Sequence, residues 1–196
     1  MAMKAADFPV IKTERLCLML PPASVAPQLL RYFVENRERL APWWPPVPPG
    51  YYTEAYWRER LARARADFEQ GQSLQLVIFE RDEPKGRVVG VSNFSGFMRG
   101  AFQACYLGYS IGARDEGHGL MREALTAAIE YVFEDLRLHR IMANYLPTNE
   151  RSGQLLRRLG FTVEGYARDY LLIAGQWRDH ILTSLTNTRL QPGDMA

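Results

Sequence analysis

Cysteine is scarce in this sequence, which has only Cys17 and Cys105 among its 196 residues. Two cysteines without a spacing pattern argue against a disulfide framework of the kind found in small secreted domains. We therefore expect both to be free thiols in a cytoplasmic protein. We expect no metal centre.

Excess charge and long apolar runs are also missing. A net charge of +2 does not by itself argue for nucleic-acid binding. No segment approaches the length of a membrane span, and the first residues, with Asp7 and Pro9, lack the apolar core of a signal peptide. With 47% apolar and 23% charged residues, the composition predicts one globular domain over residues 1–196. Its ordered core should span about residues 13–188, followed by a tail at 189–196.

The clearest pattern lies at residues 106–136. An apolar strand at 106–111 leads into a glycine-rich turn at 114–119. Apolar residues then follow at helical spacing, at positions 120, 121, 124, 125, 128, 129, 132, 133 and 136. The start of such a helix leaves backbone N–H groups free at the positive end of its dipole, which favours a phosphate-bearing ligand. The turn lacks the ending of a P-loop, and Arg122 stands where a dinucleotide fingerprint needs a third glycine.

Periodicity and turn residues predict the remaining elements. We expect strands at 13–20, 74–80, 87–97, 139–145, 161–173 and 177–186, and helices at 23–40, 54–70 and 149–159. Thr53 should cap the second helix, and Gly175-Gln176 fits a type II′ turn. The order is therefore β α α β β β α β α β β, an α/β domain on a mixed sheet.

Two motifs carry a family resemblance. The pattern Arg-x-x-Gly-x-Gly at 114–119 resembles the coenzyme A pyrophosphate loop of the GCN5-related N-acetyltransferases (GNAT), although alone it also fits a plain glycine turn. A second motif, Asn-x-x-Ser at 149–152 followed by Leu-Gly-Phe at 159–161, agrees with the family in order and separation. The resemblance implies a mixed, mostly antiparallel twisted sheet of about seven strands with about four helices. It also implies acetyl-coenzyme A as the acetyl donor.

The resemblance assigns a set of cofactor-binding residues. Backbone N–H groups of residues 115–120 would hold the pyrophosphate, with glycines that permit close approach. Arg114 adds charge or is merely exposed, and His118 is a solvated loop residue. The full set is Ile111, Arg114, Asp115, Glu116, Gly117, His118, Gly119, Leu120, Asn149 and Ser152.

Ser152 and Asn149 are the candidate catalytic residues. Ser152 should share the inward helix face with Leu155 and Leu156, where its hydroxyl needs a partner. That partner is either a backbone carbonyl one turn earlier or the sulfur of coenzyme A. Many family members have a tyrosine acid where Leu156 stands, and the resemblance implies that Ser152 takes over its role. Asn149 fits both a helix N-cap and a contact to the pantetheine arm.

The acceptor side is less sharply defined. The stiff proline-rich loop at 41–52 carries two tryptophans that either wall the acceptor cleft or pin the loop by burial. The candidate acceptor-binding residues are Trp43, Trp44, Asn93, Tyr106 and Asp169. Tyr106 occupies the position of the glutamate base of many relatives. Asp169, Asp179 and His180 remain open as bases, and so does a water chain acting on an α-amine with a pKa near ~7.7–8.

A closer resemblance narrows the acceptor. Residues 104–111, 139–145 and 169–180 are similar to the ribosomal-protein branch of the family. This implies direct acetylation of the N-terminal alanine of a ribosomal protein, the fifth protein of the small subunit, with no nucleic acid or membrane required. The alternatives are acetylation of a small amine, such as a polyamine or an aminoglycoside, and a non-catalytic role in ribosome assembly.

Overall fold

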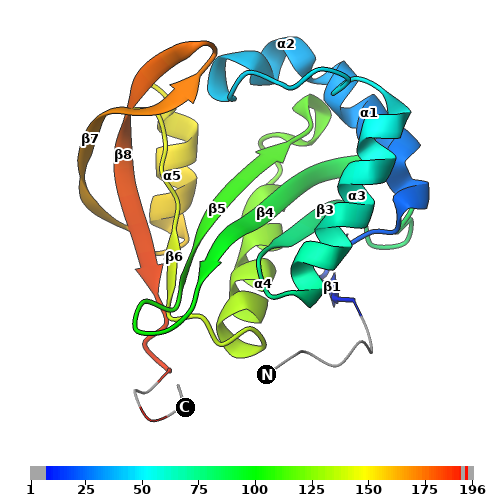
Figure 1. The fold of residues 1–196 in the computed structure, drawn as a ribbon. Coiled ribbons are helices and arrows are strands. Elements are labelled where there is room, and N and C mark those ends of the chain that lie inside the picture. Colours follow the sequence, from blue (N-terminus) through cyan, green and yellow to red (C-terminus); the bar gives the residue numbers. More distant parts are fainter. Residues whose placement is uncertain (1–7, 191–192, 194–196) are drawn as a thin grey trace.

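An eight-stranded sheet organises the computed structural model, which describes residues 8–190 and 193 (Figure 1). Its strands are β1 (Val10–Lys12), β2 (Leu16–Met19), β3 (Leu74–Glu80), β4 (Val88–Met98), β5 (Ala104–Ile111), β6 (Arg140–Met142), β7 (Thr162–Ile173) and β8 (Gln176–Thr186). The helices are α1 (Ala26–Glu35), α2 (Arg37–Leu40), α3 (Glu54–Glu69), α4 (Leu120–Glu134) and α5 (Glu150–Arg158). Short 3₁₀ turns lie at Ala23–Val25, Ala41–Trp43 and Ala113–Asp115.

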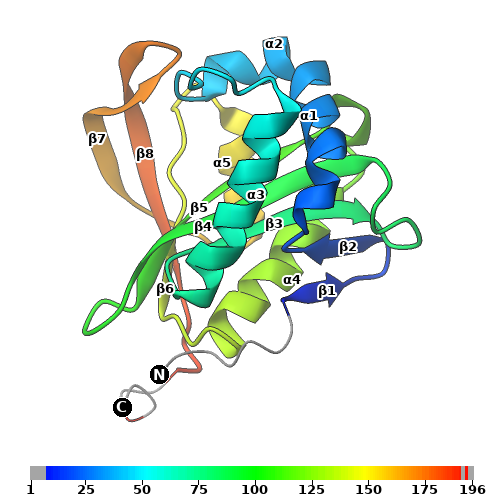
Figure 2. The same ribbon diagram turned by 45° about the vertical axis from the view of Figure 1, so that its right-hand side comes forward.

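The strand order is β1-β2-β3-β4-β5-β6-β8-β7, and β5–β6 is the parallel pair among otherwise antiparallel neighbours. Alternating side chains build two apolar cores on its opposite faces. The first core packs α4 on the sheet and includes Leu76, Ile78, Leu125 and Val132. The second core packs α1 and α3 and includes Phe33, Trp57, Val77 and Phe79 (Figure 2). The predicted α/β architecture on a mixed, mostly antiparallel sheet is confirmed.

The sheet opens between β5 and β6. These strands pair only from Ala104 opposite Arg140 to Tyr106 opposite Met142. Beyond that point β5 keeps β4 on one side, whereas the chain after β6 leaves β5 and stays beside β8, with a bridge between Tyr145 and Ile181. The edge of β5 from residue 107 to 111 therefore has no strand beside it, and Figure 1 shows α5 in the gap between β5 and the β7–β8 hairpin.

Several predicted boundaries were wrong. The helix expected at 23–40 breaks at Asn36, whose ψ of 7° is not helical, into α1 and α2. The strand expected at 139–145 ends at Met142 as β6, because the chain leaves β5 there. The hairpin turn is type I′ rather than II′, since Ala174 and Gly175 both have positive φ, 49° and 79°.

The predictions for Thr53 and for the two cysteines were confirmed. Thr53 caps α3 by accepting a hydrogen bond from the Tyr56 N–H, and both cysteines are free and buried. Among the described residues no helix is long and apolar enough to cross a membrane, and no group of three or more potential metal ligands occurs. Most of the predicted tail at 189–196, and the first seven residues that bear on a signal peptide, lie outside the described part of the chain.

Candidate active site

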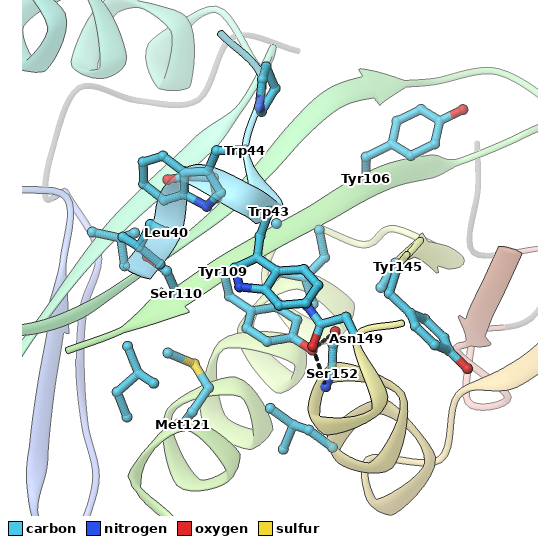
Figure 3. A pocket seen from close by; sticks show the side chains of 18 of the residues that line it. Leu40, Trp43, Trp44, Tyr106, Tyr109, Ser110, Met121, Tyr145, Asn149 and Ser152 are labelled. Atoms are coloured by element: carbon cyan, nitrogen blue, oxygen red, sulfur yellow. Dashed lines mark hydrogen bonds between the residues drawn. The ribbon is translucent and has the colours of Figure 1, made fainter. Parts of the chain in front are cut away.

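A cleft of about 1310 Å³ lies where the sheet opens (Figure 3). Its floor is the edge of β5, and its walls come from the start of α4, from α5, from the loop after α2 and from the β7–β8 hairpin. It is long enough to bring the glycine turn, Ser152 and the two tryptophans onto one continuous surface. The predicted cofactor and acceptor elements are thus joined in a single groove.

The glycine turn has the backbone geometry of an anion site. Gly117 and Gly119 have φ values of 82° and 75°, in the left-handed region, and Gly119 is the N-cap of α4. A Cβ at Gly117 would meet no atom within 4 Å, so space lies in front of it. The N–H groups of residues 117–122 have no acceptor among the described residues. They are free to bind the oxygens of a phosphate group at the positive end of the helix.

The N-terminal segment holds this turn in place. Glu123, in the first turn of α4, accepts hydrogen bonds from the Thr13 hydroxyl (2.6 Å) and from the backbone and side chain of Arg15. Although burial opposes ionisation, these hydrogen bonds lower the pKa of Glu123. Arg15 also donates to the carbonyl oxygen of His118 at 3.1 Å. A side-chain clamp thereby fixes the turn to the start of the sheet.

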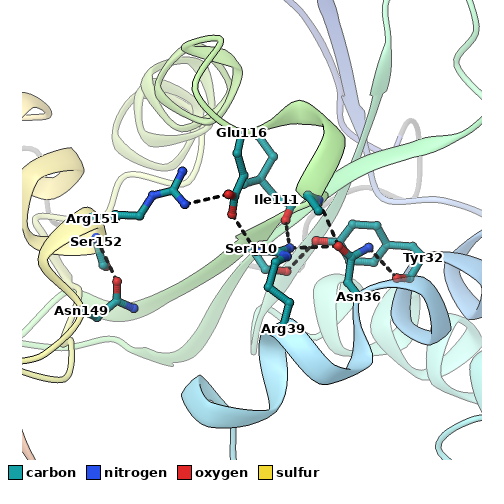
Figure 4. A network of polar contacts seen from close by, with 10 residues as sticks. Tyr32, Asn36, Arg39, Ser110, Ile111, Glu116, Asn149, Arg151 and Ser152 are labelled. Carbon is teal, nitrogen blue, oxygen red and sulfur yellow. Dashed lines mark hydrogen bonds and ion pairs between the residues drawn. The ribbon is translucent and has the colours of Figure 1, made fainter.

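The acidic residues of the turn have their own partners. The carboxylate of Asp115 is buried and takes two hydrogen bonds from Arg87, at 2.6 and 2.9 Å. Glu116 lies between Arg39 of α2 (2.6 Å) and Arg151 of α5 (2.7 Å), which bridges the two walls of the cleft (Figure 4). The structure therefore ties both carboxylates into ion pairs that shape the turn.

The other predicted cofactor residues divide by position. Ile111, Glu116, Leu120 and both turn glycines line the cleft, as do Asn149 and Ser152. Arg114 and His118 are exposed and do not line it. Arg39, which sequence reasoning missed, lines the cleft and donates to the carbonyl oxygen of Ile111. A lone arginine in a short helix gives no sequence signal for such a contact.

Ser152 faces a tyrosine that the sequence did not reveal. Its hydroxyl lies 2.7 Å from the hydroxyl of Tyr109 on β5, and Figure 3 shows the two side chains pointing toward each other. Burial raises the pKa of Tyr109 to about 12, so the phenol stays protonated at neutral pH. Asn149 caps α5 by accepting from the Ser152 N–H at 3.1 Å, which confirms its predicted capping role.

On the acceptor side, the two tryptophans differ. Trp43 is 37% exposed and lines the cleft. Trp44 also lines it, but packs on Phe33 of the second core at 5.2 Å, and its carbonyl oxygen accepts from the Ala174 N–H at 2.9 Å. The loop is therefore both a cleft wall, lined by Trp43 and Trp44, and a segment pinned to the domain by Trp44.

Of the remaining predicted acceptor residues, two line the cleft and one does not. Asn93 of β4 and Tyr106 of β5 line the cleft, and Tyr106 is 39% exposed. Asp169 lies at an irregularity in β7, is exposed and does not line the cleft. Its backbone N–H donates to Asp179 at 2.9 Å.

A coenzyme A thioester fits these features. The free N–H groups of the turn suit a pyrophosphate, and the unpaired edge of β5 leads from there into the cleft. An extended amide-bearing arm can add to such an edge through backbone hydrogen bonds, as a peptide adds to a sheet. The edge leads toward the Tyr109–Ser152 pair, where hydroxyl donors suit a sulfur that becomes negative.

Comparison with known proteins agrees with this geometry. A model of the acetyltransferase (GNAT) domain matches residues 15–162. The chain is 49% identical over 183 residues to the ribosomal protein uS5-alanine N-acetyltransferase of Escherichia coli strain K12, a match that covers 93% of each protein.

Two solved structures extend the comparison. The ribosomal-protein-S5-alanine acetyltransferase of Vibrio fischeri superposes with a TM-score of 0.88 at 35% identity, covering 94% of this chain and 100% of that one. Mycobacterium smegmatis RimJ in complex with CoA-disulfide superposes with a TM-score of 0.83 at 26% identity, covering 93% and 88%.

Proposed function

The chain belongs to the acetyltransferase (GNAT) family, and from this we propose that it transfers the acetyl group of acetyl-coenzyme A to the N-terminal alanine of ribosomal protein uS5. The observation that carries the proposal is the 49% identity to the Escherichia coli uS5-alanine acetyltransferase over 93% of both chains. A match of that extent takes in both the donor and the acceptor side of the cleft. Acetyl-coenzyme A supplies an activated thioester, so the α-amine attacks it directly without a covalent enzyme intermediate.

Different residues of the chain have different roles in this reaction. Backbone N–H groups at 117–120 bind the pyrophosphate, and an N–H of the open β5 edge polarises the thioester carbonyl. Ser152 donates to the departing sulfur. For that, Tyr109 has to donate to Ser152, and a phenol with a pKa of about 12 keeps at neutral pH the proton that this requires. This leaves the hydrogen of Ser152 free to point into the cleft.

Purified enzyme, acetyl-coenzyme A and a peptide with the first residues of uS5 test the proposal. Mass spectrometry should place one acetyl group on the α-amine. The same peptide with a blocked N-terminus should remain unmodified even where it contains lysine. Faster acetylation of spermidine or an aminoglycoside than of the peptide would instead make the protein a small-amine acetyltransferase.

Cells test the same proposal against a role in assembly. Deletion of the gene should remove the acetyl group from uS5, and the wild-type gene should restore it. A variant that cannot bind acetyl-coenzyme A should fail to restore acetylation. If that variant nevertheless corrected a defect in small-subunit assembly, the non-catalytic alternative would gain support.

Trp43→Ala should weaken peptide binding without unfolding the protein. Trp43 is partly exposed in the cleft wall, so its loss should raise the peptide KM about five- to tenfold, the cost of removing a contact worth roughly 1 kcal/mol. Steady-state kinetics measures the peptide KM. Calorimetry measures the Kd for acetyl-coenzyme A, which should stay unchanged.

Trp44→Ala is the matched control. Because Trp44 packs on Phe33, its loss should lower the stability by about 1–2 kcal/mol, less than the loss of a fully buried tryptophan, and reduce the melting temperature. If Trp43→Ala lowered the melting temperature as much and left KM unaltered, the loop would be pinned by both tryptophans and the cleft-wall assignment would be wrong.

A further inference from the structure

His180 is a buried histidine at the acceptor end of the cleft. It lies on β8, where 3% of its surface is exposed, and its side chain helps to line the cleft. Its ring packs on Tyr170 of β7 with 5.6 Å between the ring centroids. Tyr145, which follows β6, pairs through its backbone with the next residue of β8, Ile181. The imidazole thus lies on β8, on the opposite side of the sheet opening from the free edge of β5.

The hydrogen bond of the ring sets its tautomer. Nδ1 lies 3.0 Å from the carbonyl oxygen of Arg178. A carbonyl oxygen only accepts, so Nδ1 carries the hydrogen and, in the neutral ring, Nε2 carries the lone pair. Nε2 has no hydrogen-bond partner among residues 8–190, and it is not one of the unpartnered polar atoms that the protein encloses. Nε2 is therefore not fully enclosed, in a residue that lines the cleft.

We propose that His180 is the general base of the reaction, an inference that rests on the proposed acetylation of an N-terminal α-amine. The neutral amine attacks the thioester carbon, and its nitrogen becomes acidic as the N–C bond forms. Nε2 of His180 takes that proton. The C–S bond then breaks with its electron pair going to sulfur, which accepts a hydrogen bond from Ser152 and takes its proton from solvent, while His180 returns its own proton to solvent.

The other candidate bases are less suitable. The carboxylate of Asp179 accepts from the Tyr166 hydroxyl (2.6 Å) and the Asp169 N–H, and these hydrogen bonds lower its pKa. Side chains alternate along a strand, so Asp179 faces away from its neighbour His180. Asp169 does not line the cleft. Tyr106 has a phenol in place of the carboxylate of many relatives.

No titratable group around His180 is hydrogen-bonded to Nε2 among the described residues. On the strands beside it, the phenols are those of Tyr106 and Tyr109 on β5, Tyr145 after β6, and Tyr166 and Tyr170 on β7. The charged side chains are Arg140 of β6, Glu164, Arg168 and Asp169 of β7, and Arg178 and Asp179 of β8. Glu164 pairs with Arg140, and neither Glu164 nor Asp169 lines the cleft. Burial and a hydrogen bond with Tyr106 raise the pKa of Tyr170, which keeps that phenol neutral. No carboxylate is hydrogen-bonded to the imidazole among the described residues.

The test is His180→Asn, with His139→Gln as control. The amide N–H of an asparagine can still donate to the Arg178 carbonyl, so this variant removes Nε2 while keeping the local hydrogen bond. His139 precedes β6 and does not line the cleft. With the uS5 peptide, kcat/KM of His180→Asn should fall about 10- to 100-fold, at or below the low end for general base catalysis because the α-amine is already partly neutral.

The pH profile separates a base from a structural histidine. On the acidic side, kcat/KM of the wild type should report two ionisations, those of the imidazole and of the peptide amine, because both must be neutral. His180→Asn should retain only that of the amine, with an unchanged Kd for acetyl-coenzyme A, and His139→Gln should match the wild type. If His180→Asn has a much lower melting temperature than the wild type, His180→Gln takes its place in these measurements.

Two outcomes are distinguishable. A His180→Asn enzyme with the wild-type rate and both ionisations would overturn the assignment of His180 and leave the proton to water. If the wild-type enzyme did not acetylate the uS5 peptide at all, the proposed function itself would fail, whatever the histidine variants did.

Discussion

Gly119→Val is expected to abolish acetylation by removing acetyl-coenzyme A binding. Gly119 has a φ of 75°, which a β-branched residue adopts only with strain of about 1–3 kcal/mol. A Cβ there would lie 3.8 Å from the Arg15 guanidinium, at the turn whose N–H groups are free, and the larger valine side chain should keep a pyrophosphate at a distance. Together these effects should raise the Kd for acetyl-coenzyme A at least about 100-fold, equivalent to roughly 2.7 kcal/mol. Calorimetry measures this Kd directly.

Gly100→Val is the matched control for backbone strain. Gly100 lies in the turn between β4 and β5 with a φ of 70°, and a Cβ there would meet nothing within 4 Å. Both substitutions should lower the melting temperature to a similar degree, since each forces valine into the left-handed region. Only the change at Gly119 should affect the cofactor. Wild-type binding by Gly119→Val would show that the pyrophosphate does not lie at this turn.

The glycine turn and the helix after it could be recognised in the sequence because they are local. Glycine spacing and the helical stripe that follows are both contained within residues 106–136, and hydrophobic periodicity fixed the long elements for the same reason. The short β1 was missed, because three residues give too little alternation to predict a strand. The break at Asn36 was missed because the apolar pattern continues across it.

The opening of the sheet is a tertiary property that the sequence pattern does not encode. Residues 139–145 alternate like one strand, yet the first part pairs with both β5 and β8, whereas the rest keeps only β8. The Tyr109–Ser152 pair joins residues 43 positions apart, and each is unremarkable in its own element. Likewise His180 became distinct from Asp169 and Asp179 only when the folded hairpin showed which of the three lines the cleft.

Ser152→Ala should slow the chemical step while leaving cofactor binding almost intact. The hydroxyl lies in the first turn of α5, 2.7 Å from the hydroxyl of Tyr109 on β5. If Tyr109 is the donor of that hydrogen bond, the hydrogen of Ser152 can stabilise the sulfur as negative charge develops. A coenzyme thiol resembles cysteine, with a pKa near ~8.5, and is a tolerable leaving group without help. Losing one hydrogen bond to the developing anion should therefore cost about 1.5–3 kcal/mol, or roughly ten- to a hundredfold in kcat.

A double variant separates the serine from the tyrosine. Tyr109→Phe should have a smaller effect, because Ser152 keeps its own hydrogen for the sulfur. If Tyr109 acts through Ser152, adding Tyr109→Phe to Ser152→Ala should slow the reaction no further, since residues in one network are not additive. Tyr32→Phe removes the phenol from a similar tyrosine–serine pair, with Ser110 at 2.9 Å, and should leave kcat unchanged. A normal kcat for Ser152→Ala, where chemistry limits the rate, would return Ser152 to a structural role; a fully additive double variant would instead place Tyr109 on the substrate itself.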